Sequence, residues 1–204
     1  GLVGSEMCIR DSLKTAAITP QRPATTNEAK NNDFIGNLIY DNGRHGFRFL
    51  QGTGGSLLSG QIVSNVIWNN SGDGIYNPYS QQSVVVKNNI ITNNQGYGIN
   101  GPLESISYNN VWNNTNGEYG GGASAGIGDI SVNPLFADPA NGDFHLKSTG
   151  GRWNGSKWVN DNETSPCIDA GDPEDDYSHE LDYPHGKINL GAYGNTREAS
   201  LGSS

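Results

Sequence analysis

The stretch that decides the fold is "NVIWNNSGDGI" at residues 65–75, because it recurs along the chain in closely related form. "NLIYDNGRHGF" occupies 37–47 and "NIITNNQGYGI" occupies 89–99, and all three follow N-h-I-x-[DN]-N-x-x-x-G-[FI], where h is aliphatic. A shortened copy, "NVWNNTNGEYG", occupies 110–120, and successive copies begin 28, 24 and 21 residues apart. A constant motif at unequal spacing predicts one structural rung per copy, with the length changes in loops.

Each position of the motif predicts a column of equivalent side chains in a solenoid. One coil cannot bury its apolar side alone, so neighbouring coils must cover it. Asparagine suits the corners because it tolerates left-handed backbone angles, and stacked asparagines can bond one another along the axis. Glycines 46, 74 and 98 are expected at a second corner without room for a Cβ. The predicted interior file is Ile39, Ile67 and Ile91, and the predicted asparagine ladder is Asn37, Asn65, Asn89 and Asn110.

Composition and charge narrow the class of protein. The 204 residues include 29 glycines and 33% hydrophobic residues, yet the aliphatics come in short β-branched bursts and only 16% of residues are charged. These features predict a folded, turn-rich β protein rather than a disordered chain. The net charge of −9 argues against nucleic acid as a partner. No apolar run in the sequence is long enough to cross a bilayer, so membrane insertion is not expected.

The repeat resembles the right-handed parallel β-helix of the pectin-lyase-like superfamily, over roughly residues 31–195. The strings "GDISVNPLFADPANGDFHLKS", "TSPCIDAGDP" and "INLGAYGNTREAS" are similar to the closing segments of secreted bacterial β-helix repeat proteins. The predicted fold is therefore an all-β, right-handed parallel β-helix, truncated at its N-terminus and closed by irregular C-terminal coils. Within the closing part, 150–163 is expected to be a surface excursion that carries Trp153 and Trp158.

The first residues do not fit the repeat. Residues 2–12, "LVGSEMCIRDS", resemble translated DNA of a sequencing adapter, so an upstream part of the reading frame is expected to be missing. On this interpretation Cys8 is foreign, and Cys167 is left without a disulfide partner. Five segments are expected along the chain. They are an adapter-derived artefact at 1–12, a disordered or partial coil at 13–30, the parallel β-helix repeats at 31–120, terminal coils and capping loops at 121–196, and a tail at 197–204.

Two surface columns are candidate carbohydrate contacts. Tyr40, Trp68 and Trp112 would lie outside the interior isoleucine file, where stacked rings suit the apolar faces of sugars. The alternative is ordinary strand decoration that stiffens the sheet. A polar and aromatic group beside the glycine corner is the second candidate, and its alternative is a solvated turn surface. Its members are His45, Asp73, Tyr97, Arg48 and Tyr76.

The resemblance also implies enzymes, since lyases and hydrolases of this fold act on polysaccharides. Lyases of this kind need a base and either Ca²⁺ or arginine to neutralise a carboxylate, and hydrolases use clustered aspartates. The repeats offer few basic residues and only Asp33, Asp41 and Asp73, so no catalytic residue is assigned here. The acidic run "IDAGDPEDDYSHELD" at 168–182 suggests a Ca²⁺ site, but a solvated acidic loop is the preferred interpretation, so no cofactor or metal is expected.

These observations leave three functional hypotheses. The first is a secreted or cell-surface β-helix module, monomeric, that associates with polysaccharide without catalysis. The second is the C-terminal part of a polysaccharide lyase or glycoside hydrolase whose active coils lie mostly upstream. The third is a structural stalk or adhesin segment. Extracellular or cell-surface localisation is expected on all three.

Overall fold

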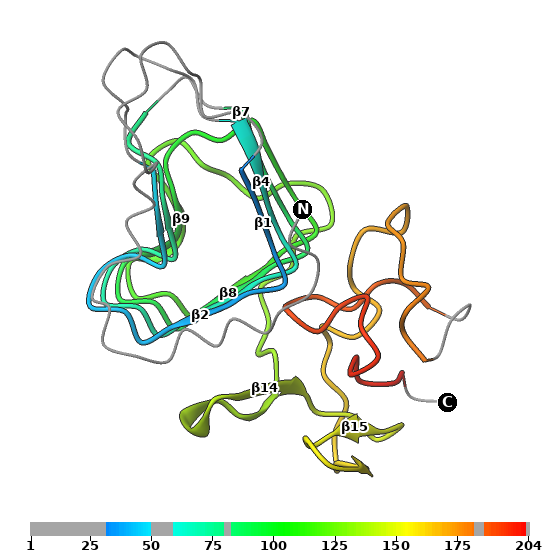
Figure 1. Cartoon of the computed structure of the whole chain (residues 1–204). Coiled ribbons are helices and arrows are strands. Elements are labelled where there is room, and N and C mark those ends of the chain that lie inside the picture. The colour runs from blue at the N-terminus through cyan, green and yellow to red at the C-terminus, as the bar shows by residue number, and fades with distance from the viewer. Residues whose placement is uncertain (1–31, 50–58, 80–82, 182–185, 203–204) are drawn as a thin grey trace.

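The structure, a computed structural model, describes residues 32–49, 59–79, 83–181 and 186–202. Over these residues it is an all-β parallel solenoid followed by an irregular C-terminal part (Figure 1). The predicted segments 1–12 and 13–30 lie outside the described residues. Over the described ranges, no helix has the length and apolar composition that a membrane span requires.

Three four-stranded parallel sheets form the walls of the solenoid. The first wall contains β1 (Asn32–Ile35), β4 (Ser59–Val63), β7 (Ser83–Lys87) and β10 (Ser105–Ser107). The second contains β2 (Leu38–Tyr40), β5 (Val66–Trp68), β8 (Ile90–Thr92) and β11 (Asn110–Trp112). The third contains β3 (Phe47–Arg48), β6 (Ile75–Tyr76), β9 (Tyr97–Asn100) and β12 (Gly117–Gly120). Each coil contributes one strand to each wall, so equivalent residues lie above one another.

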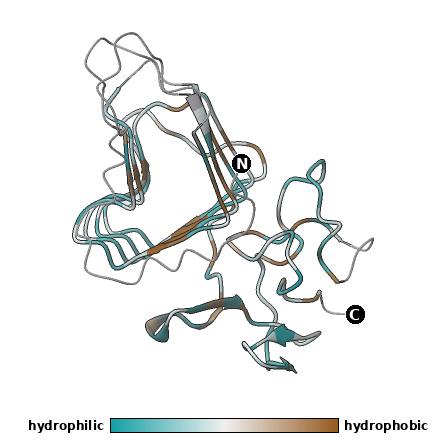
Figure 2. Cartoon of the chain, in the orientation of Figure 1, coloured by the Kyte–Doolittle hydropathy of each residue, from teal (hydrophilic) through white to brown (hydrophobic). Residues whose placement is uncertain are grey.

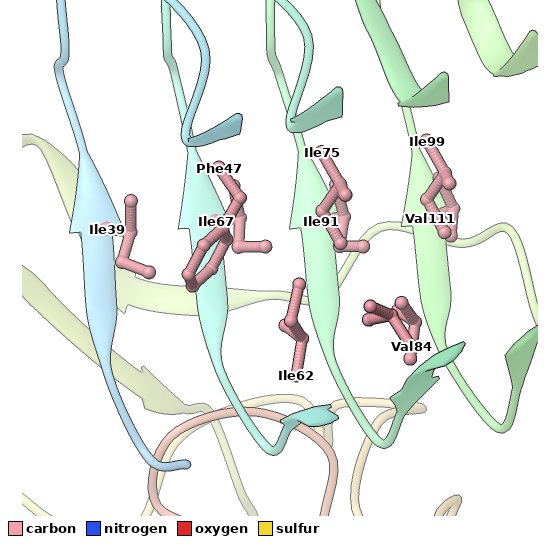
Figure 3. Packing of buried hydrophobic residues seen from close by; sticks show 10 residues of the cluster. Ile39, Phe47, Ile62, Ile67, Ile75, Val84, Ile91, Ile99 and Val111 are labelled. Atoms are coloured by element: carbon pink, nitrogen blue, oxygen red, sulfur yellow. The ribbon is translucent and has the colours of Figure 1, made fainter. Parts of the chain in front are cut away.

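The interior consists of the predicted apolar files. Ile39 pairs with Ile67, Ile67 with Ile91, and Ile91 with Val111. Figure 3 shows these side chains with Phe47, Ile75 and Ile99 of the third wall, and Ile67 and Ile91 are fully buried. Hydrophobic residues colour the inner walls in Figure 2, whereas the corners are hydrophilic. The predicted interior file is confirmed. The same strand register determines which outward side chains are neighbours from coil to coil.

The corners follow from backbone conformation. The residue after each strand of the second wall has a left-handed φ, between 51° and 60°, and these residues are Asp41, Asn69, Asn93 and Asn113. Asparagine and aspartate adopt this conformation more readily than other side chains. At the next corner, a Cβ on Gly74 would lie 2.5 Å from Ile91 Cγ2 and 2.6 Å from Gly98 O. Glycine is required there by close packing rather than by its φ.

A ladder of buried asparagines runs along the corner between the first and second walls. Asn89 Oδ1 accepts hydrogen bonds from the backbone N–H of Asn65 at 2.9 Å and from Asn65 Nδ2 at 3.0 Å. Asn89 Nδ2 in turn donates to Asn109 Oδ1 at 2.9 Å, and also to the backbone oxygens of Ile62 and Lys87. Each rung therefore satisfies the backbone and the side chain of the rung before it.

The predicted fourth member of this ladder, Asn110, is wrong by one position. Asn109 occupies the ladder, 20 residues after Asn89, while Asn110 pairs with Ile90 on the outward face of the second wall. Asn110 Nδ2 donates there to Val132 O and approaches Cys167 Sγ at 3.1 Å. The adjacent asparagines permit either alignment in sequence, and the fully buried ladder position selects Asn109.

A second ladder, absent from the sequence-based prediction, lies at the other end of the second wall. It contains Asn42, Asn70, Asn94 and Asn114, joined by Nδ2 to Oδ1 bonds of 2.8, 2.9 and 2.9 Å. Both ladders end on carboxylates. Asn109 Nδ2 donates to Asp129 Oδ1 at 3.1 Å, and Asn114 Nδ2 donates to Glu118 Oε2 at 2.7 Å. A carboxylate accepts the last amide and carries no N–H of its own that would need a further rung.

The C-terminal part covers the outward face of the second wall (Figure 1). It contains β13 (Phe136–Asp138), a short 3₁₀ helix (Pro139–Asn141), β14 (Asp143–Leu146), β15 (Arg152–Trp153) and β16 (Trp158–Val159). The β13–β14 and β15–β16 pairs are antiparallel. A second hydrophobic cluster joins wall and cover, with Val66 and Ile90 on one side and Phe144, Cys167 and Leu190 on the other.

The ladder predicts a large energetic difference between buried and exposed asparagines. Asn89→Ala removes the acceptor of two Asn65 donors and the donor to two backbone oxygens, all inside the protein. Leaving buried polar groups unsatisfied should lower the free energy of unfolding by about 3 to 5 kcal/mol. Asn116→Ala, at an exposed turn, should change it by less than about 0.5 kcal/mol. Denaturant titrations measure both, and equal losses would contradict the ladder.

The ladder end gives a second prediction. Asp129 Oδ2 accepts from Tyr119 Oη at 2.7 Å and from the backbone N–H of Gly126 at 2.9 Å. Burial raises the pKa of Tyr119, so its hydroxyl stays a donor. The Asp129→Asn substitution replaces one carboxylate oxygen, either Oδ2 or the Oδ1 that faces Asn109, with an amide group that donates instead of accepting. The free energy of unfolding should then fall by about 2 to 3 kcal/mol. Thermal unfolding would measure the loss, and a variant as stable as the wild type would show that the carboxylate is dispensable.

Candidate functional site

The outward side chains of the third wall form a connected group beside the glycine corner. We name this group the polar patch, and its members are His45, Arg48, Asp73, Tyr76, Tyr97 and Asn100. The register brings them together from three coils, because Arg48 pairs with Tyr76 and Tyr76 with Asn100. The predicted association of His45, Asp73 and Tyr97 is also observed, through hydrogen bonds between successive coils.

Asp73 is the buried centre of the polar patch, with 6% of its surface exposed. Its Oδ1 accepts the backbone N–H of Tyr97 at 2.6 Å, and its Oδ2 accepts Asn100 Nδ2 at 3.0 Å. Both oxygens are thus engaged by the next coil. The carboxylate orders the two neighbouring residues of the patch, and its geometry suits positioning better than proton transfer.

His45 makes two contacts with Asp73. Its Nδ1 accepts the backbone N–H of Asp73 at 3.0 Å and lies 3.4 Å from Asp73 Oδ2. A nitrogen that accepts an N–H carries no proton, so the imidazole is neutral with its proton on Nε2, and the carboxylate contact is not an ion pair in this state. Burial lowers the pKa of His45; Asp73 opposes this shift, whereas Arg48 and Arg44 add to it.

Tyr76 is the aromatic centre of the polar patch. The His45 ring stacks on it with centroids 4.6 Å apart and an interplanar angle of 18°. The guanidinium carbon of Arg48 lies 5.8 Å from the same ring centroid, and Arg48 Nε is buried without a hydrogen-bond partner in the described part of the chain. Arginine above a tyrosine ring is held by the attraction between a cation and a π system. The patch thus combines an aromatic ring with a neighbouring cation.

Tyr97 extends the polar patch onto the last coil. A Cβ on Gly120 would lie 2.8 Å from Tyr97 Cγ, and one on Gly117 would lie 3.6 Å from Tyr97 Cε1. The tyrosine ring therefore rests on the backbone of β12, where glycine leaves the necessary room. In the observed register Gly117 pairs with Tyr97 and Gly120 with Asn100, so the last coil has glycine at both positions.

The other predicted column is arranged differently. Tyr40, Trp68 and Trp112 do fall in one file, together with Thr92. However, Phe144 of β14 packs against Tyr40 with ring centroids 4.9 Å apart and against Trp68 at 5.6 Å. These two rings contribute to the second hydrophobic cluster rather than to an open surface. Sugar contact at this column stays a prediction, and the cover leaves less ring surface for it.

The acidic run is used to fasten the C-terminal part to the solenoid. Lys87 Nζ lies 2.7 Å from Asp175 Oδ1 and 3.3 Å from Asp172 Oδ2, and Asn88 Nδ2 donates to Asp175 Oδ2 at 2.6 Å. Burial opposes the charge of Lys87, but these two carboxylates outweigh it and raise the pKa of Lys87. Within the described ranges, no three histidine, cysteine, aspartate or glutamate side chains are grouped to hold a metal ion.

Comparison with known proteins identifies a protein family. Residues 12–171 match the model of a protein family described as disaggregatase related. No curated protein and no solved structure matches the chain. The match includes the whole solenoid and the first part of the C-terminal cover.

The state of His45 predicts a pH dependence of stability. Because the pKa of His45 is lower in the folded protein than the usual 6.5, the unfolded chain binds more protons between the two values. The contribution of neutral His45 to the free energy of unfolding is therefore complete above about pH 6.5. It is lost as the pH falls through the pKa of His45 in the folded protein. His45→Gln keeps an acceptor for the Asp73 N–H without titrating. Its unfolding free energy should fall less between pH 7 and 5 than that of the wild type, and identical slopes would contradict a neutral His45.

Proposed function

Starting from the fact that the chain belongs to the disaggregatase-related family, we propose that it is a polysaccharide-binding module that performs no catalysis of its own. The observation that carries the proposal is the polar patch. A tyrosine ring, a guanidinium and an imidazole N–H lie on one wall of a rigid solenoid, in contact with one another. Aromatic faces and fixed hydrogen-bond donors are the groups that hold sugar rings and their hydroxyls.

The solenoid supports a polymer rather than a small ligand. Equivalent residues recur from coil to coil at the spacing of neighbouring strands, about 4.8 Å. Arg48, Tyr76 and Asn100 therefore form a line parallel to the axis, and an extended chain can contact several coils at once. Several weak contacts along one polymer add up to useful affinity.

The geometry of Asp73 favours binding over catalysis. A general acid or base needs an oxygen that can reach the substrate, whereas each Asp73 oxygen accepts a hydrogen bond from the neighbouring coil. The description of the family favours a second candidate function, in which the chain is part of a protein with disaggregatase activity. In that case the described coils would hold the polymer for an active site elsewhere in the protein. Polysaccharides of cell surfaces lie outside the cell, so we place the module there in either case.

A glycan array tests the proposal. The wild type should bind at least one polysaccharide, and Arg48→Ala or Tyr76→Ala should weaken that binding about tenfold or more, because central aromatic and arginine contacts dominate such interfaces. Arg197→Ala, an exposed arginine outside the patch, is the matched control and should bind as the wild type does. Absence of binding to every polysaccharide would refute the proposal. Release of new reducing or unsaturated ends from the bound polymer would instead support a catalytic role.

A further inference from the structure

The β15–β16 hairpin carries two tryptophans directly opposite each other. Trp153 and Trp158 are cross-strand partners, with ring centroids 5.9 Å apart and an angle of 57° between the rings. Both side chains remain partly exposed. The hairpin lies at the outer edge of the C-terminal part, away from the solenoid interior (Figure 1). Two large apolar side chains are thus left partly in water on a ribbon that has only two residues in each strand.

The turn between the two strands keeps its shape without the rings. Asn154 Oδ1 accepts from the backbone N–H of Ser156 at 3.1 Å, from Ser156 Oγ at 3.0 Å and from the backbone N–H of Lys157 at 3.0 Å. The backbone N–H of Asn154 donates to Lys157 O at 3.1 Å. This pattern, in which an asparagine side chain replaces a backbone acceptor, fixes a tight turn by itself.

The base of the hairpin is fastened by charges. Arg152 binds Asp161 through Nε at 2.9 Å and Nη2 at 3.1 Å, and Arg152 Nη1 lies 3.3 Å from Asp143 Oδ2. Asp143 also contacts His145 Nδ1 at 2.7 Å. Such bidentate contacts set the direction of the strand as well as its position. The hairpin is therefore held at both ends by polar contacts that do not involve the indoles.

Trp158 lies close to the backbone of the neighbouring segment. A Cβ on Gly151 would lie 3.5 Å from Trp158 Cε3 and 3.2 Å from Leu201 Cδ1, so Trp158 rests near the backbone at Gly151 and close to Leu201. Among the aromatic rings of the described residues, Trp153 contacts Trp158. The two indoles are both partly exposed and form one apolar surface on the hairpin.

Charged and polar side chains surround the tryptophan pair. Two of the nearby cations are neutralised by carboxylates, since Lys147 Nζ lies 2.9 Å from Glu163 Oε1 and Arg152 Nε lies 2.9 Å from Asp161 Oδ2. Lys157 is exposed at the turn before β16, and Asn160, whose Nδ2 donates to Thr149 O, is exposed after that strand. An apolar ring pair with donors at its rim matches a sugar, which has an apolar ring face and hydroxyl groups around it.

The size of the surface decides against a protein partner. Stable protein–protein interfaces bury about 800 Å² on each side, which a four-residue ribbon and its turn cannot supply. The aromatic pair on its own is instead comparable in size to one or two sugar rings.

We propose that the Trp153–Trp158 pair is a second polysaccharide contact, at which a pyranose ring stacks on the exposed indole surface while Lys157 and Asn160 meet its hydroxyl or acidic groups. This inference rests on the proposed function, and it adds a site that is separate from the polar patch.

The experiment compares variants on the polysaccharide that the wild type binds most strongly on a glycan array. Trp153→Ala should weaken binding about tenfold, and Trp153→Phe should retain most of it, because an aromatic face remains. Trp158→Ala is expected to weaken binding and to lower the unfolding temperature slightly, since Trp158 also packs near Leu201. Neutral and acidic polysaccharides on the array distinguish stacking alone from stacking with charge recognition at Lys157. Addition of the bound polymer should also change the tryptophan fluorescence of the wild type more than that of Trp153→Phe.

Two patterns of results would refute this inference and remain distinguishable. If Arg48→Ala loses binding while folded Trp153→Ala binds as the wild type does, the hairpin contact is refuted and the proposed function stands. If the wild type binds no polysaccharide, the proposed function fails and the hairpin contact fails with it. Should Trp153→Ala unfold the C-terminal part, the folded Trp153→Phe variant decides: retained binding with a smaller fluorescence change than in the wild type supports the hairpin contact, and an equal fluorescence change refutes it.

Discussion

The amide ladder is the interaction on which the rest of this structure depends. An asparagine side chain buried among aliphatic residues is costly unless its donors and acceptor are all used. In this protein they are used only when the next coil stands in register, because Asn65 needs Asn89 and Asn89 needs Asn109. Register is therefore fixed at the corner, by directional bonds, while the isoleucine files supply the non-directional gain from burial. Every surface column inherits its alignment from this constraint.

The same constraint explains why the ladders end as they do. An amide at the last rung would present unused N–H groups to whatever follows. Asp129 and Glu118 accept the final donors and have none to leave unpaired. At Asp129 the second oxygen is also occupied, by Tyr119 and Gly126, so the end of the ladder is folded into the loop that closes the last coil. Termination is thus encoded chemically, by the exchange of an amide for its acceptor-only counterpart, as well as by irregular coils.

The solenoid could be predicted from the sequence because the same short motif recurs in each coil. Ile39, Ile67 and Ile91 could be aligned by inspection, and left-handed corners follow from asparagine. The prediction of the fourth ladder residue was wrong because Asn109 and Asn110 are chemically identical. They differ only in position, since Asn109 faces the interior and Asn110 faces outward. The C-terminal part has no period, and its contacts join residues far apart in the chain. For this reason, the cover over Tyr40 and Trp68 was not foreseen, although each ring had been placed in the correct column.

The three walls consequently have different roles. The second wall is occupied by the C-terminal cover, and the corner after β7 is occupied by the acidic run through Lys87. The third wall carries the polar patch, in which His45 and Arg48 flank Tyr76. A binding surface on a solenoid needs both alignment along the axis and freedom from covering segments. The polar patch has the alignment, and within the described residues the C-terminal cover lies on another wall. We therefore assign the proposed polysaccharide contact to the polar patch rather than to the more aromatic column.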